Sequence, residues 1–256
     1  MSDDSASDDG ATTSAETSEP TGDATGDDDP PNPGTDDGST DDTGSPAEGC
    51  EDQLVLDLGL VGGTISEGAT GNTRAGAGWV STVDASAGGV ANAPTNPWIY
   101  LRFTPGGLEK VEVDDLQALE STEWDIAAKR FGIRLNSGDS GPSEIRAAAL
   151  PSMAYEDVSE LPAGTELTQE SFYTADCVLI DDDSGQGAPD YLMTPWWSYP
   201  GCVATTGTPF VIELADGSLL KLVVDAYYES GQDACNTGGM MGTGSANFSW
   251  RWAYLE

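Results

Sequence analysis

The stretch "STEWDIAAKRFGIRLNSGDSGP", residues Ser121–Pro142, decides the fold class of this chain. Its apolar residues recur at every second position, which is the period of a β-strand. The apolar positions change phase around Lys129-Arg130, from Trp124, Ile126 and Ala128 to Phe131, Ile133 and Leu135. This change predicts a β-bulge or a crossing between two sheets at Lys129-Arg130.

Three charged residues of this stretch, Asp125, Arg130 and Arg134, are expected to make hydrogen bonds that set the fold of a half-buried strand. The following Gly138–Gly141, "GDSG", is similar to the loop around the nucleophilic serine of chymotrypsin-like proteases. A nucleophile of that class needs a histidine to accept its proton, and the chain has no histidine. We therefore interpret the loop as a turn. Since no paired carboxylates stand out for acid–base chemistry either, we expect no enzymatic activity.

The rest of the chain after Cys50 has mostly the same period of two. Two β-hairpins are predicted, one at residues 98–113 around Thr104–Gly107 and one at residues 210–228 around Ala215–Gly217. Residues 246–255, "ANFSWRWAYL", are predicted to form a closing strand, and residues 115–119 one short helical turn. These elements predict an all-β fold, a single antiparallel domain over residues 50–256.

Residues 1–49 differ sharply in composition from the remainder. They contain none of the nine basic residues, no aromatic residue and a third of the 45 acidic ones. Such a segment buries too little apolar surface to offset its ordering entropy, so we predict a disordered acidic tether. The formal net charge of −36 argues against nucleic acid as a partner and against direct attraction to an anionic membrane.

The chain opens on Met1-Ser2-Asp3-Asp4, directly in the acidic segment. Mature bacterial lipoproteins often begin with a lipidated cysteine followed by such a polar tether. We hypothesise that Met1 stands in place of that cysteine after removal of a signal peptide, with a cytoplasmic protein as the alternative. The expected location is then the outer membrane, at the cell surface or outside the cell, held only by a lipid anchor.

The four cysteines, Cys50, Cys177, Cys202 and Cys235, fit an exported protein with two disulfides. Their spacing matches no zinc site. Four cysteines allow three pairings, and we favour Cys177–Cys202 with Cys50–Cys235, which would tie the start of the domain to a late loop.

The opening stretch resembles the HmuY-like haem-binding family of bacterial outer-membrane lipoproteins. The resemblance rests on Trp124–Ala127, Arg130-Phe131, Ile133-Arg134, Asn136–Gly138 and Ser140-Gly141, and it extends over residues 96–256. It implies a two-sheet β-rich domain that captures haem for iron acquisition and passes it to an outer-membrane receptor. The best-known member grips iron between two histidines, which this chain lacks, while other members use methionines.

Haem binding requires an axial donor and an apolar slot. We choose Met153 and Met193 as candidate axial ligands on chemical grounds, with a pocket wall formed by Tyr191, Trp196, Trp197 and Tyr199. A thioether is a soft ligand, so such a site would prefer ferrous haem. Met240-Met241 lies in a Gly-rich loop, and Cys202 is a donor only if it is not in a disulfide. The alternative for every methionine is a role in core packing.

The predicted function is therefore non-enzymatic haem capture with a non-histidine iron ligand. The alternative is a cell-surface interaction module that kept the scaffold and lost haem, which the absence of histidine favours. Asp181–Asp183 could supply hard ligands to Ca²⁺, but its spacing does not match an EF-hand loop and we interpret it as a solvated loop.

Overall fold

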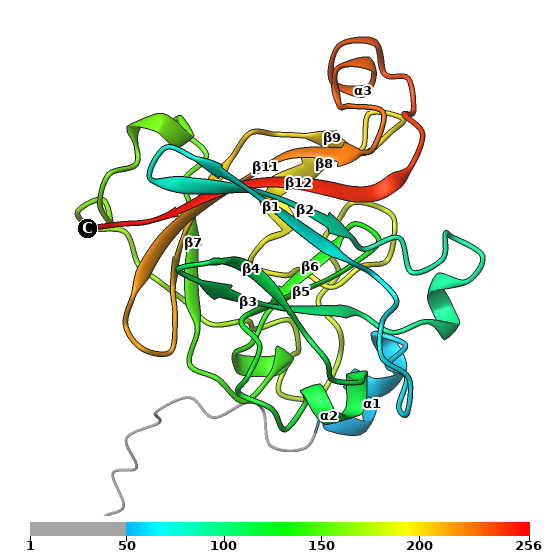
Figure 1. The fold of residues 1–256 in the computed structure, drawn as a ribbon. Helices are drawn as coiled ribbons and strands as arrows, with labels where there is room; N and C mark the ends of the chain where they lie inside the picture. Colours follow the sequence, from blue (N-terminus) through cyan, green and yellow to red (C-terminus); the bar gives the residue numbers. More distant parts are fainter. Residues whose placement is uncertain (1–49) are drawn as a thin grey trace, which may run out of the picture. The chain divides into compact units, whose positions relative to one another are not determined.

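The computed structural model of the protein describes residues 50–256; the tether predicted for residues 1–49 lies outside them. The regular secondary structure of this part is mainly antiparallel strands, in sheets of six, four and two strands, which confirms the all-β class (Figure 1).

The six-stranded sheet has the order β1-β2-β12-β11-β10-β7. Its strands are β1 (Thr70–Ala75), β2 (Gly78–Asp84), β7 (Arg146–Ala149), β10 (Pro209–Glu213), β11 (Leu219–Tyr228) and β12 (Ser245–Tyr254). The second predicted hairpin is the β10–β11 pair, and the predicted closing strand is β12. The β1–β2 hairpin was not anticipated, since its strands are short of apolar residues and β1 is mostly exposed.

The four-stranded sheet has the order β4-β3-β5-β6, with β3 (Ile99–Thr104), β4 (Gly107–Val111), β5 (Ile126–Lys129) and β6 (Gly132–Leu135). The first predicted hairpin is the β3–β4 pair. The predicted bulge or crossing at Lys129-Arg130 is wrong, because β5 and β6 form a tight hairpin there with Lys129 opposite Gly132. Arg130 takes a left-handed conformation (φ 56°) in the turn. The alternation of apolar positions shifts here because the chain reverses direction. The reversal places Ile126 opposite Leu135, with both side chains on one face of the sheet.

The short elements include a two-stranded ribbon and three helices: β8 (Trp197–Ser198), β9 (Ala204–Thr205), α1 (Glu51–Asp57), α2 (Asp115–Ala118) and α3 (Asp233–Gly238). Four 3₁₀ turns complete them: η1 (Ala93–Thr95), η2 (Gly138–Ser140), η3 (Tyr155–Asp157) and η4 (Thr194–Trp196). Helix α2 is the predicted helical turn, and a capping box between Asp114 and Gln117 caps its N-terminus. Helices α1 and α3 were missed, because one turn or two leaves no helical period in the sequence.

A first cluster of buried apolar residues fills the space between the two larger sheets. The alternation along β12 supplies Phe248, Trp250 and Trp252 to it, and all three are almost completely buried. Phe103 of β3 packs edge-on against Trp252 with 4.9 Å between ring centroids. The aromatic strands recognised in the sequence therefore face each other across the core.

A second cluster is centred on Arg134 of β6, which is fully buried. Its guanidinium lies 5.0–5.4 Å from the ring centroids of Trp98, Tyr100 and Trp124. It donates to the carbonyl of Ser140 (2.7 Å) and to the Tyr100 hydroxyl (2.6 Å). The predicted role of the charged residues in setting the fold is confirmed for Arg134, and Asp125 likewise accepts a 2.8 Å hydrogen bond from the Phe103 amide.

The protease-like loop is a structural turn, as the missing histidine indicated. Gly138 has φ +50°, and a Cβ there would lie 1.9 Å from the carbonyl oxygen of Glu170. The Asp139 carboxylate accepts hydrogen bonds from the amides of Phe172 (2.7 Å) and Tyr173 (2.9 Å). The loop thereby joins η2 to the segment that begins at Glu170.

All four cysteines are in disulfides, but the favoured pairing is wrong. The bonds are Cys50–Cys177 and Cys202–Cys235. Cys50 and Cys177 belong to the second cluster, whereas Cys202 and Cys235 belong to the first. The predicted pairs would each have had to join the two clusters, and spacing along the chain does not reveal that separation.

Candidate functional site

The aromatic segment around Met193 is divided between the two clusters. Tyr191 belongs to the second cluster, while Met193, Trp196 and Trp197 belong to the first. These four side chains are buried, and Tyr199 is 44% exposed. The structure therefore brings most of the predicted pocket wall together around η4 and β8, but as packed rings rather than as an open slot.

The rings of this segment are held by neighbours from other strands. The Trp196 indole donates to the Phe131 carbonyl (3.2 Å), and its ring lies 5.3 Å from that of Phe248. The Trp197 ring lies 4.8 Å from Phe131 and 6.5 Å from Tyr199. The β5–β6 turn and β12 thus position the two tryptophans.

The space among these rings is small. The hollow lined by Phe131, Tyr191, Trp196 and Trp197 is too narrow to admit a water molecule, whereas pockets for small ligands and cofactors usually have about 300–1,000 Å³. Met193 is completely buried beside it. In this conformation the residues around Met193 do not fit a porphyrin, which would require the segment of residues 191–199 to move outward.

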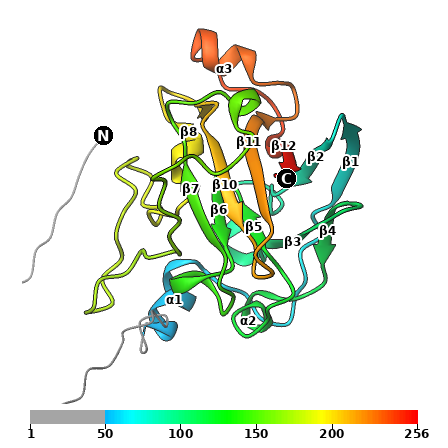
Figure 2. The same cartoon turned by 90° about the vertical axis from the view of Figure 1, so that its left-hand side faces the viewer.

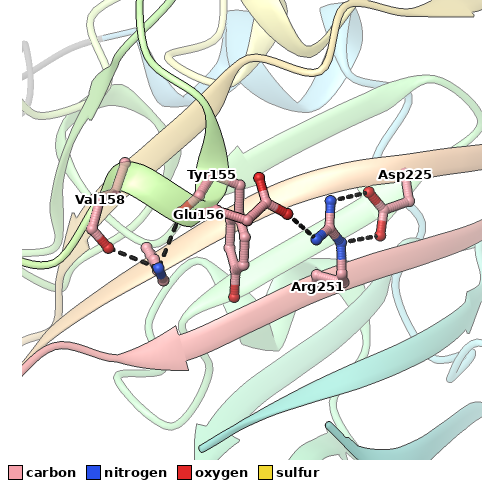
Figure 3. Close-up of polar contacts among 6 residues, drawn as sticks. Tyr155, Glu156, Val158, Asp225 and Arg251 are labelled. Carbon is pink, nitrogen blue, oxygen red and sulfur yellow. Dashed lines mark hydrogen bonds and ion pairs between the residues drawn. The ribbon is translucent and has the colours of Figure 1, made fainter. Parts of the chain in front are cut away.

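Met153 lies in a strap, residues 150–161, which packs on one face of the six-stranded sheet (Figure 3). Lys221 of β11 donates to the carbonyls of Tyr155 (2.9 Å) and Val158 (2.6 Å). Arg251 of β12 holds Asp225 through two hydrogen bonds and Glu156 through a third of 2.6 Å. Residues Leu150, Val158 and Val211 form a third cluster of buried apolar residues, and Met153 is half-buried against it.

The two candidate ligands are not brought together. Val211 of β10 contacts the strap, while its neighbours Phe210 and Ile212 face the first cluster, which contains Met193. Successive side chains of a strand point to opposite faces of a sheet. Met153 and Met193 therefore lie on opposite faces of the six-stranded sheet, and this arrangement does not support a single iron between them.

The remaining methionines are exposed. Met240 and Met241 follow α3 and are each 64% exposed. The Cys202–Cys235 disulfide anchors this corner, which projects from the sheets in Figure 1. Since Cys202 is oxidised, its thiolate is excluded as an iron ligand.

A buried glutamate links the candidate segment to the family-like stretch. The two carboxylate oxygens of Glu170 accept 2.9 Å hydrogen bonds, one from the Leu135 amide of β6 and one from the Leu192 amide beside Met193. Burial raises the pKa of Glu170 to about 7; Arg134 lowers that pKa and Asp139 raises it. Glu170 is therefore a pH-sensitive contact at the start of the aromatic segment.

Two open clefts lie elsewhere. One of about 710 Å³ is lined by Arg102, Asp125, Asp216 and Tyr254 among others. One of about 370 Å³ is lined by residues 64–68, by the loop after β2 and by Asn96-Pro97. Neither contains a methionine or a tryptophan. Within residues 50–256 no group of three or more histidine, cysteine or carboxylate side chains is arranged to hold a metal ion.

Sequence reasoning missed two features. The relay from Arg134 through the Tyr100 hydroxyl to Asp115 (3.0 Å) joins strands that are distant in the chain, and only the rarity of arginine pointed toward it. The cleft beside Arg102 and Tyr254 is formed by strand ends, for which the sequence gives no signal. None of the helices in the described part has the length and apolar character that a membrane crossing requires.

A family model described as HmuY protein matches residues 94–238 of the chain, which is more than half of it. The match includes the stretch from Ser121 to Pro142 and the aromatic segment around Met193. The search of curated proteins returns no match.

Similar solved structures share little sequence with this chain. One from Bacteroides vulgatus, described as an HmuY-like haem-binding protein, is 17% identical, covering 70% of this chain and 93% of that one with a TM-score of 0.43. One from Bacteroides fragilis, described as a lipoprotein, is 13% identical, covering 72% and 92% with a TM-score of 0.42. The apo HmuY analogue of Tannerella forsythia is 17% identical, covering 75% and 98% with a TM-score of 0.40.

Proposed function

The chain belongs to the HmuY protein family, and from that membership we propose that it is a non-enzymatic haem-binding protein. The family match over residues 94–238 is the observation that carries the proposal. The buried motif residues Trp124, Asp125 and Arg134 act as scaffold in this proposal, because they bond to β3, α2 and η2 and leave haem contact to other segments.

We further propose that the iron ligand is a methionine, because the chain offers no imidazole and its cysteines are oxidised. Met193 lies among the aromatic rings that would wall a porphyrin, but it is reachable only if residues 191–199 move. Met153 is nearer the surface, in the strap on the other face of the sheet. Since one iron cannot contact both in this arrangement, each is a separate candidate.

The cellular setting is part of the proposal. We propose a lipid-anchored protein at the outer membrane that captures haem for uptake and passes it to a receptor. Two disulfides in the described residues support an oxidising compartment, and the acidic composition of residues 1–49 suits a tether.

The experiment is a haem titration followed in the Soret band, with ferric haem and with dithionite-reduced haem. We expect binding in both states and tighter binding of ferrous haem, because a thioether is a soft ligand. Met193→Ala or Met153→Ala should weaken binding and move the band, and the exposed Met240→Ala serves as the matched control. No Soret shift in either state at tens of micromolar protein would refute haem binding.

A second candidate function follows from the clefts. The two open clefts described above lack methionine and tryptophan, and the space beside Met193 is closed. These observations favour a surface interaction module that kept the scaffold and lost haem. The same titration separates the two functions, since the module predicts a flat response.

A further inference from the structure

A cleft of about 710 Å³ opens where the core between the two larger sheets ends. Phe103 lines the cleft, and its ring packs against that of Trp252 in the core. Tyr254 continues the inward-facing positions of β12, with its ring 5.8 Å from that of Trp252, but it is only half-buried because the sheet stops there. The β10–β11 turn and the C-terminal end of β12 lie on the left of Figure 1, the side that faces the viewer in Figure 2.

The cleft presents hydrogen-bonding groups that have no partner elsewhere in residues 50–256. The Arg102 guanidinium is exposed and makes neither a hydrogen bond nor an ion pair with any described residue. The Tyr254 hydroxyl is likewise unbonded in that part of the chain. Asp125 is 9% exposed, and one of its oxygens accepts from the Phe103 amide (2.8 Å), while the other is left for the cleft.

The cleft holds charged groups of both signs, two carboxyl groups and one guanidinium. Burial raises the pKa of Asp125 to about 6, an effect that Arg102 partly offsets, while hydrogen bonds from Ser218 hold the pKa of Asp216 below its usual value. An anion would meet the two carboxyl groups, and a cation would meet the guanidinium. A neutral ligand that can both donate and accept hydrogen bonds matches donors and acceptors set side by side.

We propose that this cleft binds a neutral polyhydroxylated ligand, of the class of short oligosaccharides. Each sugar hydroxyl can donate to the free oxygen of Asp125 and accept from Arg102. The half-exposed Tyr254 ring and Leu214 supply an apolar contact for the less polar face of a sugar ring. The volume lies within the range of specific small-molecule pockets.

The test is calorimetric titration of the full chain with neutral trisaccharides, namely maltotriose, cellotriose, mannotriose and xylotriose. At least one should bind with a Kd below about 1 mM. Arg102→Ala and Tyr254→Phe should each weaken that binding about tenfold, because each removes a group used by the ligand. Neither side-chain group removed is bonded to a described residue, so melting temperatures should stay near that of the parent. Arg74→Ala, an exposed arginine on β1, is the matched control.

Three results would overturn the proposal. One is the absence of binding by all four trisaccharides at about 5 mM. Another is binding that neither substitution weakens. The third is sulfate binding that depends on Arg102, since this would make the ligand an anion. Haem binding is measured separately with the Soret band, and the cleft contains no methionine, so either activity can fail without the other.

Discussion

The two main clusters of buried residues in this domain differ in the kinds of side chain that they contain. The first, between the sheets, is built from apolar and aromatic side chains, among them Met193 and Trp196. The second is centred on a fully buried Arg134, with the carboxyl groups of Asp115 and Glu170 close by and aromatic rings around it. Both are closed to solvent, but only the second is built around a fully buried cation.

This difference explains what the family-like stretch encodes. Arg134 and Asp125 belong to that stretch, and their partners lie on β3, α2 and η2. A buried charge without its partners is costly, so these positions tolerate little change. The stretch therefore marks a scaffold held by polar contacts, whereas candidate ligand residues lie in segments whose packing is apolar and more easily altered.

The largest expected effect concerns the disulfide of the second cluster. Cys50–Cys177 closes a separation of 127 residues and Cys202–Cys235 one of 33. In the chain-entropy model, their removal costs about 5 and about 4 kcal/mol. We expect Cys50→Ser/Cys177→Ser to lower the free energy of unfolding in urea more than Cys202→Ser/Cys235→Ser. The reverse order would show that the first cluster depends more on its covalent link.

The next effect tests the buried charge. Arg134→Met should lower the free energy of unfolding by about 4 kcal/mol, because it leaves Asp115 and Glu170 buried without the cation. Arg146→Met, which removes an exposed ion pair with Glu213, should cost less than about 1 kcal/mol. Equal effects of the two substitutions in urea unfolding would remove the distinction between the clusters.

The pH dependence of stability sharpens the comparison further. Burial raises the pKa of Glu170 to about 7, from a usual value of 4.5. The folded chain therefore binds this proton more tightly than the unfolded chain between those values. Stability from this group is fully present below about pH 4.5 and is lost as pH rises through 7, by about 3 kcal/mol in all.

Glu170→Gln should flatten this slope in urea unfolding between pH 5 and pH 8. Its absolute stability should also fall, because Leu135 and Leu192 donate to different carboxylate oxygens, and the substitution replaces one of these oxygens with an NH₂ group that cannot accept. The exposed Glu166→Gln is the control and should keep the parent's slope. An unchanged slope in Glu170→Gln would mean that this carboxyl group titrates normally in the folded chain.

The sequence predicted those parts of the molecule that depend on local periodicity. The two hairpins, β12 and the α2 turn follow from alternation and capping residues within a few positions. The Lys129-Arg130 turn was misread because a tight hairpin and a bulge shift the apolar phase alike. The disulfide pairing and the separation of Met153 from Met193 depend on which cluster a segment joins, and such long-range packing leaves no local pattern.

The smallest expected effect concerns Met240, at the exposed corner beside the first cluster. Its side chain is 64% exposed, so Met240→Ala should change the free energy of unfolding by no more than about 0.5 kcal/mol. Met193→Ala removes a fully buried side chain and should cost about 2–5 kcal/mol. Urea unfolding of the two variants measures the contrast directly. Haem titration of the same variants then separates an effect on packing from an effect on iron ligation. If only Met240→Ala lost haem affinity, at unchanged stability, the iron ligand would be Met240 at the exposed corner. That result would also leave both clusters as scaffold.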